Sequence, residues 1–102
     1  MYWNISDEER LYQAFELATD RRLLVDFLYD LLTDKEMEHC INRLKTACLL
    51  NDGASYTEIA KVTKLSPTII ARLSKQLQEE DSGFSQILEK FLSKGRGESY
   101  FD

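Results

Sequence analysis

Apolar residues recur at helical spacing along most of this chain. Met37, Ile41, Leu44 and Cys48, for example, follow one another at intervals of four, three and four residues, which places them on one face of a helix. Read together with the polar residues that begin and end helices, the pattern predicts six helices. Their expected bounds are about 7–18, 21–31, 33–50, 55–62, 66–80 and 84–92.

Capping signals support several of these starts. Ser66 followed by Pro67 favours a helix start, because serine caps free backbone N–H groups and proline is tolerated at the first helical position. Gly53 follows the third predicted helix, where glycine suits the left-handed conformation that ends many helices. Three further residues stand three positions before a glutamate, which is the capping-box spacing; they are Ser6, Thr33 and Ser55.

Length and composition fit a single all-α domain. The chain has 102 residues, one proline and four glycines, and long stretches of Leu, Ala, Glu, Lys and Arg favour helix over strand. We expect one domain over residues 1–94 and a disordered tail over 95–102. Segment 21–31 is apolar nearly all the way round, and a domain this short buries such a helix with difficulty unless a second subunit covers it. The sequence therefore favours a homodimer.

The stretch from about 55 to 77 has the pattern of a helix-turn-helix. This motif needs two short helices that cross at a wide angle, apolar inner faces and a small residue where the helices meet. Ala60 supplies the small residue. Lys64 departs from the pattern, because the turn commonly has glycine there for its left-handed backbone. The positions expected to face inward are Ile59, Ala60, Thr63, Leu65, Ile70 and Leu73.

The second helix of this motif has an outward face suited to a DNA groove. Recognition helices read base edges from their first turns, where a hydroxyl and small apolar groups suit thymine methyls. Lysines and the hydroxyls at helix starts are better placed for phosphates, which set affinity and not sequence preference. The candidate DNA-binding residues are Ser55, Thr57, Lys61, Lys64, Ser66, Pro67, Thr68, Ile69, Ala71, Arg72 and Lys75.

Charge is distributed unevenly along the chain. The formal net charge is −5, which is unusual for a nucleic-acid binder. Residues 1–38 contain ten acids and four bases (−6), residues 39–78 six bases and two acids (+4), and the remainder six acids and three bases (−3). Because local potential governs phosphate contact, the positive middle segment is compatible with DNA binding despite the acidic total.

Other kinds of chemistry find little support in the sequence. Cys40 and Cys48 lie eight residues apart on one predicted helix, about 12 Å at helical rise, so we expect two buried, reduced thiols. With one histidine and no Cys-x-x-Cys, no metal site is indicated. No Gly-rich phosphate loop or catalytic motif appears in the sequence, so we expect that the protein is not an enzyme. The absence of a leader and of a bilayer-length apolar run favours a cytoplasmic protein.

Five short motifs stand out between Leu31 and Leu92: Leu32-Thr33-Asp34-Lys35-Glu36, Asn42-Arg43-Leu44, Asp52-Gly53, Ser55-Tyr56-Thr57-Glu58-Ile59 and Ile70-Ala71-Arg72. On these motifs the stretch from Leu31 to Leu92 resembles the Trp repressor family, and within it the YerC/YecD-type branch. The resemblance implies a six-helix subunit whose first helices interlace with those of a partner. The resulting two-fold dimer would present two recognition helices one DNA turn apart and act as a transcriptional repressor.

The resemblance also implies a ligand pocket. In the Trp repressor an indole ligand lies between two arginines with a threonine nearby, and Arg43, Arg72 and Thr33 match those places. The family has glycine directly after the recognition-helix arginine, whereas this chain has Leu73, whose side chain would fill the pocket. We therefore expect no cofactor, and Arg43 would instead pair with a nearby carboxylate or contact the partner subunit.

Two other functions remain open. The predicted helix-turn-helix could bind another protein, because the acidic ends of the chain could repel DNA. Alternatively, the regulator could respond to an amino-acid corepressor. Salt separates DNA binding from protein binding: about six phosphate contacts make affinity fall steeply as salt rises, whereas an apolar interface hardly responds.

Overall fold

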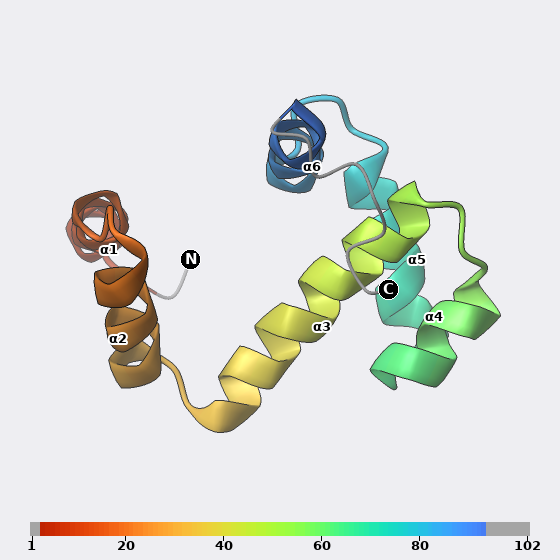
Figure 1. Ribbon diagram of the computed structural model, residues 1–102, viewed down its shortest axis with the longest axis horizontal. Coiled ribbons are helices and arrows are strands. Elements are labelled where there is room, and N and C mark those ends of the chain that lie inside the picture. Colours follow the sequence, from red (N-terminus) through yellow and green to blue (C-terminus); the bar gives the residue numbers. More distant parts are fainter. Residues whose placement is uncertain (1–2, 94–102) are drawn as a thin grey trace. The chain divides into compact units, whose positions relative to one another are not determined.

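The computed structural model describes residues 3–93, and within them it contains six helices and no strand (Figure 1). The predicted all-α class and the number of helices are confirmed over this range. The tail expected at 95–102 lies outside the described residues. The helices are α1 (Ile5–Leu17), α2 (Arg21–Leu31), α3 (Asp34–Asn51), α4 (Tyr56–Thr63), α5 (Pro67–Leu77) and α6 (Gly83–Ser93).

Most of the predicted helix starts are confirmed by side-chain caps. The Thr33 hydroxyl accepts the N–H of Glu36 over 3.1 Å, and the Glu36 carboxylate accepts the N–H of Thr33 over 2.9 Å, which is the reciprocal capping box. Ser55 caps α4 and Ser66 caps α5 through the same kind of hydroxyl bond, 3.1 and 3.2 Å long.

The capping box expected at Ser6 is wrong. The cap of α1 is Asn4, whose side-chain oxygen accepts the backbone N–H of Ser6 over 2.8 Å and its hydroxyl over 2.6 Å. Asparagine caps as well as serine does. Because this asparagine precedes Ser6 by two residues, the helix begins earlier and Ser6 lies inside its first turn.

The end of α5 also differs from its expected position. The sequence places it near residue 80, but α5 ends at Leu77. The next helix contributes to this end, because the single hydrogen of the Ser85 hydroxyl is shared between the carbonyl oxygens of Leu77 and Glu79, at 2.7 and 3.1 Å. The Leu77 carbonyl thus finds a partner outside α5, where the chain turns into α6.

The described residues fall into two compact units, 3–37 and 38–93. In the first, α1 and α2 touch through Phe15 and Phe27, whose rings meet edge to face with centroids 5.3 Å apart. Neither helix has a buried residue, and in this unit only Ala18 between them is buried among the described residues. Large apolar side chains such as Leu23 and Tyr29 are 48% and 69% exposed.

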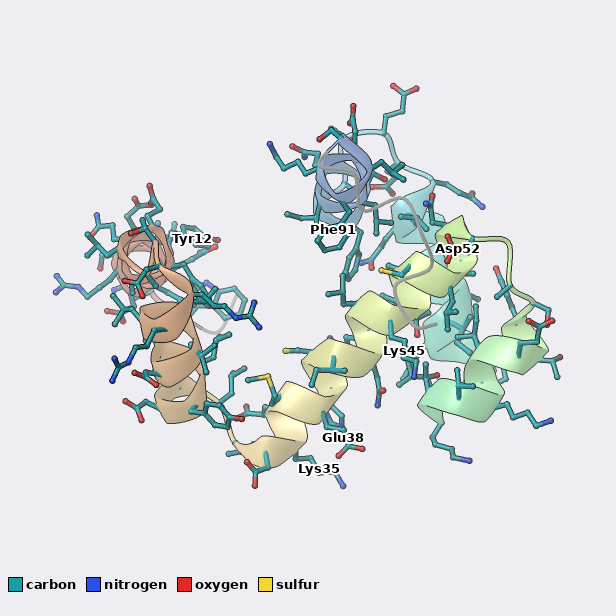
Figure 2. All side chains as sticks on the ribbon, viewed as in Figure 1. Tyr12, Lys35, Glu38, Lys45, Asp52 and Phe91 are labelled. Atoms are coloured by element: carbon teal, nitrogen blue, oxygen red, sulfur yellow. The ribbon has the colours of Figure 1, made fainter. Side chains whose placement is uncertain are left out.

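The second unit has a core formed by α3, α5 and α6. Ala47 and Cys48 of α3 are buried together with Leu88 of α6. Figure 2 shows Phe91 extending from α6 toward α3, in agreement with its packing against this cluster. Burial raises the pKa of the Cys48 thiol, and the carboxylate of Asp52 raises it further. Four half-buried residues surround the cluster: Leu44, Leu77, Phe84 and Phe91.

The two cysteines differ in environment. Cys48 is buried, as expected, but Cys40 is exposed, so the prediction of two buried thiols is wrong for Cys40. The difference follows from position on α3, because the apolar cluster that α3 forms with α5 and α6 lies toward the C-terminal end of α3, where Cys48 is. Over the residues described, no helix is long and apolar enough to cross a membrane.

Candidate nucleic-acid interface

Helices α4 and α5 form the predicted helix-turn-helix, shown as the green and cyan helices of Figure 1. They pack directly on each other, and Ile59 and Ile70, one from each helix, are both completely buried. Lys64 has φ 62° and ψ 13°, the left-handed conformation expected of this turn position. The inward positions are confirmed: Ile59, Thr63, Ile70 and Leu73 are buried, and Ala60 and Leu65 are half-buried.

The outward face of α5 lies open to solvent. Thr68, Ala71, Arg72 and Lys75 are all exposed. Ile69 differs, because it is half-buried and one side of it faces a hollow beside α3. The part of α5 available to a groove is therefore a stripe of one hydroxyl, one methyl and two cationic side chains.

A second set of candidate residues lies on α4 and at the two helix starts. Thr57 and Lys61 of α4 are exposed, and so is Lys64 in the turn. Ser55 and Ser66 are also exposed, although each hydroxyl oxygen already accepts a backbone N–H as a cap. Each hydroxyl keeps its own hydrogen, so it can donate to a phosphate oxygen while it caps.

The cationic side chains of this surface are unpaired within residues 3–93. Lys61, Lys64 and Lys75 form no ion pair or side-chain hydrogen bond with a described residue, and the same holds for Arg72. In the positive middle segment the only acids are Asp52 and Glu58. A surface of unpaired cations with few acids attracts polyanions, and no ion pair within residues 3–93 has to be broken before a polyanion binds.

Arg43 and Arg72, which the sequence placed at a ligand pocket, meet at one hollow. This hollow has a volume of about 160 Å³. Arg43 is exposed on α3 and forms no ion pair with a described carboxylate, so the ion pair expected for it is not found. Leu73 is only 5% exposed and lines the same hollow. The full lining is Arg43, Ile69, Arg72, Leu73, Gln76 and Phe84.

Thr33, the third residue of the expected pocket, belongs to the first unit. It lies at the start of α3, where its hydroxyl is the cap described above. The structure therefore brings Arg43 and Arg72 together and assigns Thr33 a local role in starting α3.

Two residues of the hollow were missed by sequence reasoning. Gln76 follows Arg72 by four residues on α5, so helical spacing was a usable signal for it. Phe84 comes from α6, and no spacing rule along α5 predicts its place. Only the packing of α6 against α5 brings it to the hollow.

Comparison with known proteins agrees with this geometry. The family model described as Trp repressor protein matches residues 7–92, well over half of the chain, and it covers α1 and α2 as well as the helix-turn-helix. No curated protein and no solved structure matched the chain. Proteins of the matched family are non-enzymatic regulators. The chain thus belongs to the Trp repressor family.

Proposed function

We propose that this protein is a homodimeric, sequence-specific DNA-binding transcriptional repressor that acts through α4 and α5. One observation carries the proposal: the inner side of the helix-turn-helix is buried at Ile59, Thr63, Ile70 and Leu73, while its outer side presents exposed hydroxyl groups and cationic groups that have no partner within residues 3–93. Membership of a family of regulators supports the same function.

Base reading is assigned to the first turns of α5. Thr68 and Ala71 are exposed one helical turn apart, and Arg72 follows directly. A threonine hydroxyl and small methyl groups suit thymine and adenine edges, and an arginine fork suits guanine. Ile69 is half-buried, so we assign it a supporting contact only, and Pro67 serves to begin the helix.

Phosphate contact is assigned to the lysines and helix-start hydroxyls. Lys61 and Lys64 lie at the end of α4 and in the turn, and Lys75 lies on the last turns of α5. Phosphate contacts fix register on the duplex without reading sequence. The hydroxyl groups assigned to phosphate are those of Ser55, Thr57 and Ser66.

Dimerisation is supported by the exposed apolar surface of the first unit. A monomeric protein rarely leaves large contiguous apolar surface in water. In α2 alone, Leu23, Tyr29 and Leu31 are 48%, 69% and 42% exposed. A second copy that covers α1 and α2 would remove this surface from water. It would thereby supply the burial that the single domain predicted over 1–94 needs for segment 21–31.

The test is selection of bound sequences from a random duplex pool, together with a mass determination in solution. We expect an enriched palindrome bound by a dimer, with affinity that falls by roughly 10³ or more between 50 and 200 mM salt if about six phosphates are contacted. No enrichment, or salt-independent capture, would contradict the proposal and favour a protein-interaction module.

Two groups of variants separate overall DNA affinity from the recognition of base sequence. Alanine at Lys61, Lys64 and Lys75 should weaken binding to all sequences alike and reduce the salt slope by about one per lysine. Alanine at Thr68 or Arg72 should change which sequences are enriched. Lys90→Ala is the matched control, because Lys90 is exposed on α6, outside the proposed surface.

A ligand-responsive repressor is the second candidate function, and the hollow at Arg43 and Arg72 favours it. Two unpaired guanidinium groups beside a hollow lined by no carboxylate suit an anion. The hollow, about 160 Å³ in volume, has room for several water molecules or a small anion. Because Leu73 occupies part of this site, tryptophan should leave DNA affinity unchanged, which the same selection with and without tryptophan measures.

Placement in the YerC/YecD-type branch is a further proposal, and it rests on the motifs around Thr33, Arg43 and Tyr56. A corepressor-free DNA-binding profile would support that placement.

A further inference from the structure

The turn between α4 and α5 contains a buried hydroxyl group, that of Thr63. Thr63 is the last residue of α4 and is 2% exposed. Its hydroxyl donates to the backbone carbonyl of Ile59 over 2.7 Å and accepts the backbone N–H of Leu65 over 3.3 Å. One side chain therefore ties the last turn of α4 to the segment that leads into α5.

The two hydrogen bonds of the Thr63 hydroxyl enclose Lys64, a residue in an energetically unfavourable left-handed conformation. Lys64 lies between the two bonded residues at φ 62°, which a residue with a Cβ atom adopts only when its surroundings hold it there. Two bonds hold it: its own N–H donates to the carbonyl of Ala60 over 2.9 Å, and the next N–H, of Leu65, donates to Thr63. Without the hydroxyl, the N–H of the half-buried Leu65 loses its partner.

We infer that Thr63 is a positioning residue for DNA recognition, because its hydroxyl fixes the direction in which α5 leaves the turn. The inference rests on the proposed DNA-binding function. Thr68 and Arg72 lie on the first turns after this point, and hydrogen bonds to base edges weaken steeply with distance and angle. A small change of direction at the turn therefore displaces the groups assigned to base reading.

The chain contains a matched control for this role. Thr46 is also fully buried, and its hydroxyl donates to a carbonyl four residues earlier, that of Asn42, over 2.8 Å. Thr46 lies within α3 and its recorded bond stays inside that helix. Replacing Thr46 by valine removes a buried hydroxyl of the same kind without touching the turn.

The experiment compares full-length Thr63→Val, Thr63→Ser and Thr46→Val with the unaltered protein. Affinity is measured for the sequence selected from the random pool, at a temperature where circular dichroism shows each variant folded. Hydrogen exchange of the Leu65 amide is measured by NMR. We expect Thr63→Val to lose about tenfold or more in affinity and to speed Leu65 exchange. Thr46→Val should bind within twofold of the unaltered protein, and Thr63→Ser should restore both affinity and protection.

Each failure has a distinct meaning. If the unaltered protein selects no sequence, the proposed function is wrong, while Leu65 exchange still reports on the turn. If the unaltered protein binds but Thr63→Val binds equally well, or Thr46→Val weakens binding as much, the inference is overturned. Should Thr63→Val fail to fold, Thr63→Ser decides: retained affinity supports the hydroxyl, and lost affinity shows that the methyl group matters instead.

Discussion

The two units of this chain use apolar residues in opposite ways. In residues 38–93, Ile59 and Ile70 are completely buried and three helices enclose Ala47 and Cys48. In residues 3–37, Ile5 and Leu17 are 71% and 75% exposed and no residue of either helix is buried. The second unit buries a core of its own, although Ile41 and Val62 are each 53% exposed, whereas the apolar surface of the first unit favours a partner.

Charge also differs between the first unit and the part of the second unit that contains the helix-turn-helix. Residues 1–38 carry a formal charge of −6, and residues 39–78 carry +4. Apolar surface with acidic surroundings suits a protein partner, while unpaired lysines on a packed helix-turn-helix suit a phosphate backbone. The comparison fits the proposed function, in which the first unit would assemble subunits and the helix-turn-helix of the second would meet DNA.

The largest effect is expected from Leu23→Glu in α2. If α2 is covered by a second copy, the variant buries an unpaired carboxylate at a cost of about 3 kcal/mol or more, and two-fold symmetry doubles the effect. Sedimentation equilibrium should show the dimer replaced by monomer. Arg22→Glu is the control, because it places a carboxylate at the neighbouring exposed polar position and lowers the net charge by two instead of one. A Leu23→Glu protein that stays dimeric would exclude this face of α2 from the interface.

A somewhat smaller effect is expected from Ile70→Ala, which removes a completely buried side chain from the helix-turn-helix. Large-to-small changes at such sites cost about 2–5 kcal/mol in stability. Urea unfolding followed by circular dichroism measures the change at fixed protein concentration. Val62→Ala on α4 should alter stability by about 0.5 kcal/mol or less, because Val62 is 53% exposed. Equal effects at the two positions would mean that α4 and α5 do not form the packed motif.

Lys64→Gly should raise stability slightly. A left-handed residue with a Cβ costs about 1–2 kcal/mol, and the greater backbone freedom of glycine offsets about 0.5–1 kcal/mol of that gain. The net gain should be about 1 kcal/mol or less, with weaker DNA binding because a proposed phosphate contact is lost. Thermal unfolding measures the change in stability, and a DNA-binding titration measures the change in affinity. A loss of stability would show that the lysine side chain itself stabilises the turn.

The smallest effect concerns the first unit. The Tyr12 hydroxyl and the Trp3 indole N–H both donate to the Glu8 carboxylate, and these bonds lower the pKa of Glu8, with Tyr12 contributing most. Figure 2 labels Tyr12 on α1. A lowered folded pKa means that the bonds stabilise the ionised form at neutral pH and that this contribution is lost as pH falls through the folded pKa.

Tyr12→Phe should therefore raise the pKa of Glu8 toward its usual value, as measured by NMR titration. Tyr29→Phe should leave the Glu8 pKa unchanged, because Tyr29 is 69% exposed on α2 and forms no recorded bond with Glu8. A Glu8 pKa that is equally low in both variants would remove Tyr12 as the cause.

The sequence by itself determined the helices, most of their caps and the inner face of the helix-turn-helix. These features depend on residues three or four positions apart, such as Thr33 with Glu36 or Ser66 with Ile69, so local spacing specifies them. The candidate DNA-binding face follows from the same periodicity, and ten of its eleven residues are exposed as expected.

Which surfaces are covered, and which residues from different helices meet, depends on the tertiary structure. Ser85 of α6 bonds the carbonyl of Leu77 at the end of α5, and Phe84 joins Arg43 and Arg72 at one hollow. These relations join backbone and side-chain groups of separate elements, whose meeting depends on packing energy and not on periodicity along one helix. For the same reason the sequence predicted that segment 21–31 needs burial, but the structure was needed to show that its own unit does not supply it.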